Sequence, residues 1–206
     1  MTMSEVDVPL FEDALRQAES KLSKVAGSAC TIGAHVTLDE GLMGAIKAVD
    51  DAAFRAELRY EMADLIDRVN RRGFVAIVAH CAGKLLGFIY GYDDPDVEGG
   101  FYGDTLASSV EGKGVGSTMF ALMLLYCYDN GYRFFSLHTE DVDEKGRHLR
   151  QFYEALGAEY LYTDPRSGVH MRMRLDPRRL NEDYRRFILE ERSRMDSTAS
   201  SNPPLS

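Results

Sequence analysis

A glycine-rich segment near the middle of the chain, residues 110–118, constrains the fold more than any other stretch. Gly112, Gly114 and Gly116 recur at every second position, between an extended run and an apolar run that ends at Asn130-Gly131. This pattern predicts a strand, a tight loop and the start of a helix. Glycines leave backbone N–H groups unscreened, and the start of a helix carries the positive end of its dipole. The segment is therefore predicted to bind an anion, with phosphate the favoured ligand.

Two common phosphate-binding loops do not fit this segment. A Walker loop needs Ser or Thr after its Gly-Lys pair and a glycine six residues before the Lys. Here Lys113 is followed by Gly114, and the earlier position holds Ala107. A dinucleotide fingerprint places its third glycine where this chain has Ser117 or Met119. A glycine-rich turn without a ligand remains an alternative on the local sequence alone.

Composition is typical of one globular domain with appendages. The chain has 206 residues, of which 45% are apolar and 28% are charged. No apolar run is long enough to span a membrane and no signal segment is evident, so we expect a cytoplasmic protein that does not bind membranes. The net charge of −9 argues against a nucleic-acid partner. Cys30, Cys81 and Cys127 lack metal spacing and are expected to be buried thiols without a disulfide.

The order of predicted elements excludes a simple doubly wound sheet. An amphipathic helix ending near Gly27 is followed by a strand, two helices and three consecutive strands. The second of these two helices is expected to be capped by Asp50 or Asp51. Then come the glycine loop, a buried helix, a strand, a helix at 146–156 and two final strands, before a charged helix that reaches about Met195. Three consecutive strands require a mixed α/β sheet.

Two motifs on this framework resemble the GNAT N-acetyltransferase superfamily. The family signature of Gln or Arg, two residues, Gly, one residue, and Gly or Ala matches residues 111–116, except that Glu111 occupies the first position. A second signature, an aromatic pair before a Leu-Gly turn, matches residues 152–157. The resemblance covers about 29–175. It implies a mixed, mostly antiparallel sheet of about seven strands flanked by helices, with extra N- and C-terminal helices.

The resemblance also implies a domain organisation and a cofactor. We expect a helical extension at 1–28, an acyl-CoA-binding catalytic domain at 29–175, a C-terminal helix at 176–195 and a disordered tail at 196–206. The glycine loop should hold the pyrophosphate of acetyl-CoA, and the end of the preceding strand should pair with the pantetheine arm. The residues expected to bind the cofactor are Leu106, Ala107, Ser108, Val110, Glu111, Gly112, Lys113, Gly114, Val115, Gly116, Ser117 and Thr118.

Catalytic roles follow from the family positions. Tyr153 occupies the position of the family's general acid, which protonates the departing thiolate. The alternative interpretation is that Tyr153 is an aromatic residue that only packs on a core helix. Asp104 and Glu98 are candidates for the general base, and His138 is a third. A solvated carboxylate is the alternative for the two acids, and a packed histidine for His138. No metal is required by this chemistry.

Two positions depart from the family pattern. Glu111 would place a carboxylate beside the pyrophosphate, which is unfavourable unless its side chain points away. Gly146 stands where the family often has an Asn that contacts pantetheine. Substrate recognition is expected at about 41–70 and 160–172. The terminal helices could serve a homodimer or pack on their own domain.

The sequence therefore predicts an acyl-CoA-dependent N-acyltransferase. The favoured reaction transfers acetyl from acetyl-CoA to a primary amine of a small molecule or peptide, by direct attack. Another acyl-CoA or a hydroxyl acceptor is an alternative. A second alternative, from a class other than enzymes, is a CoA-binding or interaction module without turnover.

Overall fold

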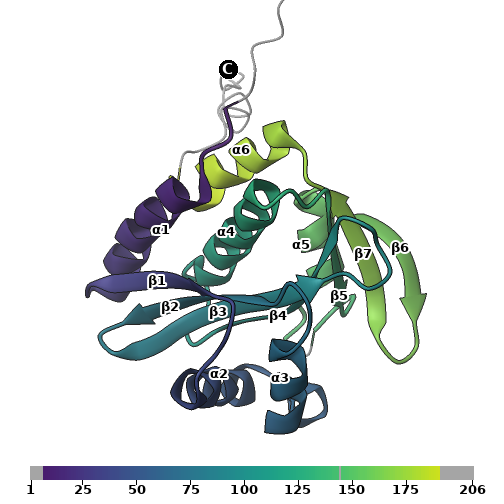
Figure 1. Ribbon diagram of the computed structural model, residues 1–206, viewed down its shortest axis with the longest axis horizontal. Coiled ribbons are helices and arrows are strands. Elements are labelled where there is room, and N and C mark those ends of the chain that lie inside the picture. Colours follow the sequence, from purple (N-terminus) through teal and green to yellow (C-terminus); the bar gives the residue numbers. More distant parts are fainter. Residues whose placement is uncertain (1–6, 144, 191–206) are drawn as a thin grey trace, which may run out of the picture.

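A computed structural model describes residues 7–143 and 145–190, which form seven strands and six α-helices around one sheet. Figure 1 shows their arrangement. The strands are β1 Cys30–His35, β2 Val75–Cys81, β3 Lys84–Asp93, β4 Gly100–Ser108, β5 Phe134–Thr139, β6 Glu159–Asp164 and β7 Gly168–Arg174. The helices are α1 Phe11–Ala26, α2 Glu40–Ala53, α3 Met62–Val69, α4 Val115–Asp129, α5 Leu149–Ala155 and α6 Pro177–Phe187.

The sheet has the order β1-β2-β3-β4-β5-β7-β6. All neighbouring strands are antiparallel except β4 and β5, which are parallel. Helices α1, α4 and α6 cover one face, and α2 and α3 cover the other (Figure 1). The predicted fold class is therefore confirmed. Helices α1 and α6 contact α4 of the same chain, so the terminal helices extend the one domain.

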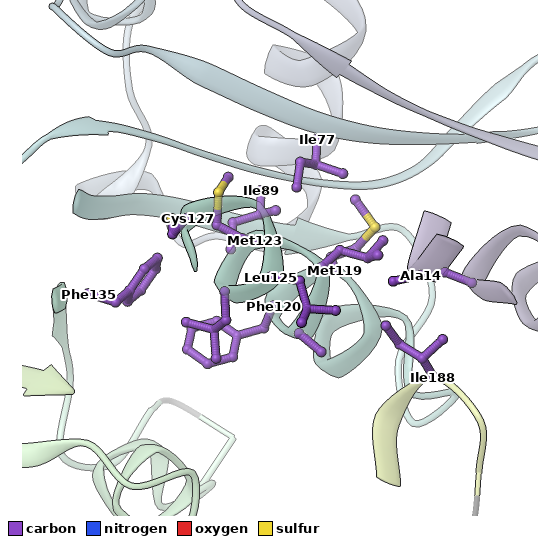
Figure 2. Packing of buried hydrophobic residues seen from close by; sticks show 14 of the residues in the cluster. Ala14, Ile77, Ile89, Met119, Phe120, Met123, Leu125, Cys127, Phe135 and Ile188 are labelled. Atoms are coloured by element: carbon purple, nitrogen blue, oxygen red, sulfur yellow. The ribbon is translucent and has the colours of Figure 1, made fainter. Parts of the chain in front are cut away.

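Helix α4 lies at the centre of the larger core because it is apolar on every side. Ten of its fifteen residues are buried. Figure 2 shows its side chains between the sheet residues Ile77 and Ile89, Ala14 of α1, and Ile188 just after α6. The sheet below and two helices above therefore hold this helix, and its N-terminus is fixed at the end of the glycine loop.

The second of the two helices before β2 begins elsewhere than the sequence pattern indicated. Asp50 does not cap a helix: it lies near the end of α2, is buried, and accepts the N–H of Tyr60 at 3.4 Å. Asp39 is the N-cap of α2 and accepts the N–H of Leu42 at 2.7 Å, while α3 begins at a capping box of Glu61 and Asp64. The local sequence offered several acidic caps, and tertiary packing selected among them.

The last two helices are shorter than predicted. Helix α5 begins at Leu149 rather than at Gly146, since Asp143 accepts the N–H groups of Lys145 and Arg147 and keeps this segment in a turn. Helix α6 ends at Phe187, where the chain turns so that Ile188 enters the core. Residues 191–195 of the expected helix, and the tail at 196–206, lie outside the described residues.

The expectation of three unpaired thiols was wrong for two cysteines. Cys30 and Cys81 lie opposite each other in β1 and β2, with Cα atoms 4.2 Å apart, and form a disulfide. Their separation of 51 residues hid this proximity in the sequence. Cys127 is a buried free thiol, as expected, and burial raises its pKa well above the ordinary value.

A bulge in β4 shapes the centre of the sheet. Tyr90 pairs with Thr105 and Gly91 with Gly103, so that Asp104 is the extra residue on β4. The strands approach closely here, because a Cβ on Gly91 would lie 2.2 Å from the carbonyl oxygen of Tyr102. Only glycine fits at Gly91 without moving a backbone.

We expect Gly91→Ala to lower the free energy of unfolding by about 3 kcal/mol, because the added methyl group overlaps β4. Gly44→Ala in α2 is the matched control, since nothing lies within 4 Å of the added Cβ. It should raise stability by about 0.5 kcal/mol through helix propensity. Urea denaturation measures the free energy of unfolding of both variants. Equal changes in the two variants would contradict the close approach of the strands at Gly91.

Candidate active site

The central feature of the site is the separation of β4 from β5. Their pairing runs from Gly100–Phe134 to Gly103–Leu137 and then stops, although β4 continues to Ser108 and β5 to Thr139. Beyond that point β4 pairs only with β3 among the described strands. The edge of β4 that faces β5 therefore presents main-chain groups to an open wedge.

The glycine loop lies at the open end of this wedge and leads into α4. Gly112 and Gly114 have φ angles of +68° and +73°, a conformation that favours glycine. Gly114 is the N-cap of α4, and no side chain caps the helix. The first three N–H groups of α4, at Val115, Gly116 and Ser117, therefore have no acceptor within the helix.

The space around this helix start fits a phosphate group. Nothing lies within 4 Å of the position that a Cβ would take on Gly112 or on Gly116. Uncapped N–H groups at the positive end of a fifteen-residue helix form an anion site. The residues present thus fit the pyrophosphate of a CoA ester.

Two serines anchor the loop to the sheet. Ser109 donates its N–H and its hydroxyl to the carbonyl of Leu86 in β3, both at 2.9 Å. The hydroxyl of Ser108 donates to the carbonyl of Val110 at 2.7 Å. These bonds fix the direction in which the loop leaves β4.

The structure places the unfavourable carboxylate of Glu111 in an ion pair. Its Oε1 accepts a hydrogen bond from the Nζ of Lys145, in the segment between β5 and α5. The hydrogen bond and the positive charge of Lys145 lower the pKa of Glu111. Lys145 thus neutralises the acid and joins the glycine loop to the other side of the wedge. Sequence reasoning missed this lysine, because the pairing spans 34 residues.

Tyr153 lies on α5 and packs against the core. Its ring centroid is 5.4 Å from that of Phe120 of α4 and 5.2 Å from that of Phe152. Burial raises the pKa of Tyr153 to about 12. Its hydroxyl therefore stays protonated at neutral pH and can donate a proton. Among the described residues, no hydrogen bond occupies this hydroxyl.

Asp104 is the first β4 residue beyond the paired segment, but its carboxylate is already engaged. Oδ2 accepts from the Nε of Arg68 at 3.0 Å and from the hydroxyl of Tyr92 at 2.8 Å, and Oδ1 accepts from Thr105 at 3.0 Å. The side chain is 2% exposed. The guanidinium of Arg68 lies 3.8 Å above the Tyr60 ring. Sequence reasoning missed Arg68, because it lies 36 residues before Asp104 and the local sequence does not indicate that the two side chains meet.

His138 lies across the wedge from Asp104 on β5, on the face covered by α2 and α3. It is exposed, pairs in register with His170 of β7, and has its ring centroid 3.5 Å from that of His170. The ring of Tyr102 meets it edge-on at 5.1 Å. Partial desolvation by the surrounding rings, followed by the charge of His170, lowers the pKa of His138, which favours the neutral ring at pH 7.

His170 continues this cluster toward the β6–β7 turn. Its Nε2 forms a hydrogen bond with the hydroxyl of Ser167 at 2.7 Å, and Ser167 donates to Asp164 at 3.1 Å. The ring of Tyr162 stacks on His170 at 4.1 Å. The final hairpin, one of the two segments expected to recognise the substrate, thus reaches the wedge.

Glu98 does not lie with these residues. It precedes β4, at the end of the strand opposite the glycine loop, and is exposed. It lines a surface depression of about 790 Å³ together with Arg71, Asp94 and Tyr132. A second depression of about 360 Å³ shares Arg71 and Tyr132. Both lie near the C-terminal end of α4, away from the wedge.

Within residues 7–143 and 145–190, no group of three His, Cys, Asp or Glu side chains could hold a metal ion. In the same residues no helix is long and apolar enough to cross a membrane.

We expect Arg68→Met to lower the free energy of unfolding by about 3 kcal/mol, because it leaves the buried carboxylate of Asp104 without its counter-charge. Arg16→Met is the control: the Arg16–Asp13 pair on α1 is exposed, and its loss should cost less than about 0.5 kcal/mol. Adding Asp104→Asn to Arg68→Met should recover much of the loss. Thermal or urea unfolding measures the stability of all three variants. If Asp104→Asn restores no stability to Arg68→Met, the ion pair is contradicted.

Solved structures with this fold include acetyltransferases. A GNAT-family protein from Desulfovibrio desulfuricans is 18% identical, with a TM-score of 0.59 over 72% of this chain and 100% of its own. The ribosomal-protein-S18-alanine N-acetyltransferase from Escherichia coli is 13% identical, with a TM-score of 0.57 over 71% and 94%. An aminoglycoside 6'-N-acetyltransferase complexed with coenzyme A is 16% identical, with a TM-score of 0.59 over 71% and 97%. At these identities, the likeness establishes the fold.

No protein of curated function matches the sequence. The sequence profile of the acetyltransferase (GNAT) family matches residues 43–158, which is more than half of the chain and includes both the glycine loop and Tyr153. The chain therefore belongs to the GNAT acetyltransferase family.

Proposed function

We propose that this protein transfers the acetyl group of acetyl-CoA to a primary amine by direct attack. One observation carries the proposal: the open edge of β4 leads directly into the uncapped N-terminus of α4. A pantetheine arm can extend a sheet along such an edge, while a pyrophosphate binds the N–H groups at the helix start. The solved aminoglycoside acetyltransferase with coenzyme A shares this fold, which supports the choice of cofactor.

The residues of the wedge divide into binding and chemical roles. Bound acetyl-CoA supplies an acetyl thioester as the electrophile. The main chain of Leu106, Ala107 and Ser108 holds the pantetheine arm, and the loop from Val110 to Thr118 holds the phosphates. Lys145 keeps the carboxylate of Glu111 neutralised beside them. The amine would enter from the face of the sheet covered by α2 and α3.

Tyr153 is proposed as the general acid. When the amine nitrogen bonds to the acetyl carbon and the carbon–sulfur bond breaks, the departing sulfur needs a proton. The hydroxyl of Tyr153 carries that proton at neutral pH, because burial raises the pKa of Tyr153 to about 12. It also makes no hydrogen bond among the described residues that would hold it elsewhere.

For the general base, the geometry favours His138 over Asp104 and Glu98. The carboxylate of Asp104 would have to give up Arg68 and Tyr92 to accept a proton. Glu98 lies at the far end of β4. His138 is accessible at the mouth of the wedge, and partial desolvation lowers its pKa, which favours the neutral ring at pH 7. We propose that it takes the amine proton, and that Asp104 holds Arg68 and Tyr92 in place beside it.

Calorimetric titration of acetyl-CoA tests the binding site. Wild type should bind, and Gly114→Asp should lose binding, because a carboxylate would occupy the anion site and Gly114 has a φ of +73°. Gly131→Asp is the matched control: Gly131 also has a positive φ, of +82°, but lies past the other end of α4. It should bind as wild type does.

Loss of binding in both variants would indicate a fold defect instead. No binding by folded wild type would overturn acetyl-CoA as donor and direct the titration to other acyl-CoA esters. Binding without thiol release across a panel of amines would favour a module without turnover, and release with alcohols alone would favour a hydroxyl acceptor.

Kinetics with an accepted amine test the acid. We expect Tyr153→Phe to lower kcat about 100-fold with little change in the KM for acetyl-CoA, because the phenol acts only on the departing sulfur. The wild-type rate should not fall between pH 8 and pH 10 on account of Tyr153, since a phenol with a pKa of about 12 stays protonated there. Tyr128→Phe, on α4, is the control and should leave kcat unchanged. An unaltered rate in Tyr153→Phe would overturn the assignment.

A further inference from the structure

One lysine outside the family-matched region reaches the glycine loop. Lys21 lies on α1, and its side chain is only 10% exposed. Its Nζ donates to the carbonyl oxygen of Phe187 at 2.7 Å, and the carboxylate of Glu190 lies 3.5 Å away. A lysine is rarely buried to this extent unless its ammonium group is paired.

The ammonium group of Lys21 lies beside the start of α4. Its Nζ is 3.5 Å from the position that a Cβ would take on Gly114, the N-cap of that helix. Thr118 in the first turn of α4 donates to the same Phe187 carbonyl, at 3.0 Å. Helix α1, the N-terminus of α4 and the end of α6 therefore meet at one point.

The groups that meet at this point carry an excess of positive charge, which favours the binding of an anion. Three uncapped N–H groups and the positive end of the α4 dipole already point outward from the loop, and Lys21 adds a full positive charge next to them. Its counter-ion, Glu190, is a side chain that is 65% exposed. A partly exposed ion pair of this length contributes little, so the charge of Lys21 remains available to a better partner.

We propose that Lys21 is a phosphate-binding residue of the acetyl-CoA site, and that its ammonium group contacts a CoA phosphate in place of Glu190. This inference rests on the proposed function. It assigns to the N-terminal helix a direct part in cofactor binding. It also explains why a basic side chain on α1 is buried against a helix start, where positive charge is otherwise unfavourable.

Calorimetry of acetyl-CoA on three variants tests the proposal. Lys21→Met should weaken binding about tenfold, the effect of losing one charge-assisted hydrogen bond, and methionine suits the buried site. Lys24→Met removes the same charge from an exposed position one turn along α1 and should leave the affinity unchanged. Glu190→Gln removes the competing carboxylate and should tighten binding two- to threefold, by about 0.5 kcal/mol.

Salt and ligand controls separate a phosphate contact from a structural one. The affinity of Lys21→Met should depend less steeply on salt than that of wild type, because one screened charge pair is gone. Acetyl-dephospho-CoA, which lacks the 3'-phosphate, distinguishes the two phosphate positions. If Lys21→Met weakens both ligands, Lys21 contacts the pyrophosphate, and if it weakens acetyl-CoA alone, Lys21 contacts the 3'-phosphate.

If wild type binds acetyl-CoA and Lys21→Met binds it with the same affinity, this inference is overturned and the proposed function stays intact. Equal losses in Lys21→Met and Lys24→Met would overturn it as well. Should Lys21→Met unfold, Glu190→Gln decides: an affinity no tighter than that of wild type would show that the charge of Lys21 is not shared with the ligand. Failure of folded wild type to bind would remove both proposals.

Discussion

The structure depends on the point at which β4 and β5 cease to pair. Parallel strands normally continue as neighbours, and here the pairing ends after four residue pairs. The bulge at Asp104 adds one residue to β4 and increases its local twist, which turns the strand away from β5. A Cβ would lie 2.2 Å from the Tyr102 carbonyl oxygen on Gly91 and 2.3 Å from the Phe135 ring on Gly103, so both positions beside the bulge require glycine. A core strand thereby acquires an open edge without becoming an outer strand of the sheet.

The buried helix α4 completes the proposed binding site at this open edge. Because α4 is apolar on every side, it is held between the sheet and the terminal helices, and its N-terminus cannot move away from the glycine loop. Its free N–H groups are therefore presented in a fixed place. Preorganised donors of this kind bind an anion without a further ordering cost.

A protein with a net charge of −9 must offset its own carboxylates around an anion site. Lys145 pairs with Glu111 at the loop, and Arg68 pairs with Asp104 in the wedge. Burial, followed by the charge of Asp104, raises the pKa of Tyr90, Tyr92 and Tyr102, so these phenols remain neutral. On the face of the sheet covered by α2 and α3, the phenols are thus neutral and the carboxylate of Asp104 is already in an ion pair.

The sequence by itself determined the order of elements, the sheet class and the family, because these follow from hydrophobic periodicity and from two short motifs whose residues are close in the chain. The glycine loop and Tyr153 could be located in this way. The tertiary structure alone decided which side chains face one another: Cys30 with Cys81, Glu111 with Lys145, Asp104 with Arg68 and His138 with His170. Each of these pairs joins residues 32 or more positions apart, and local sequence carries no information on strand register or on which helix face meets the sheet. For the same reason the cap of α3 and the ends of α5 and α6 differed from expectation. Asp50 is buried near the end of α2, Asp143 accepts the N–H groups of Lys145 and Arg147 before α5, and Ile188 enters the core after α6.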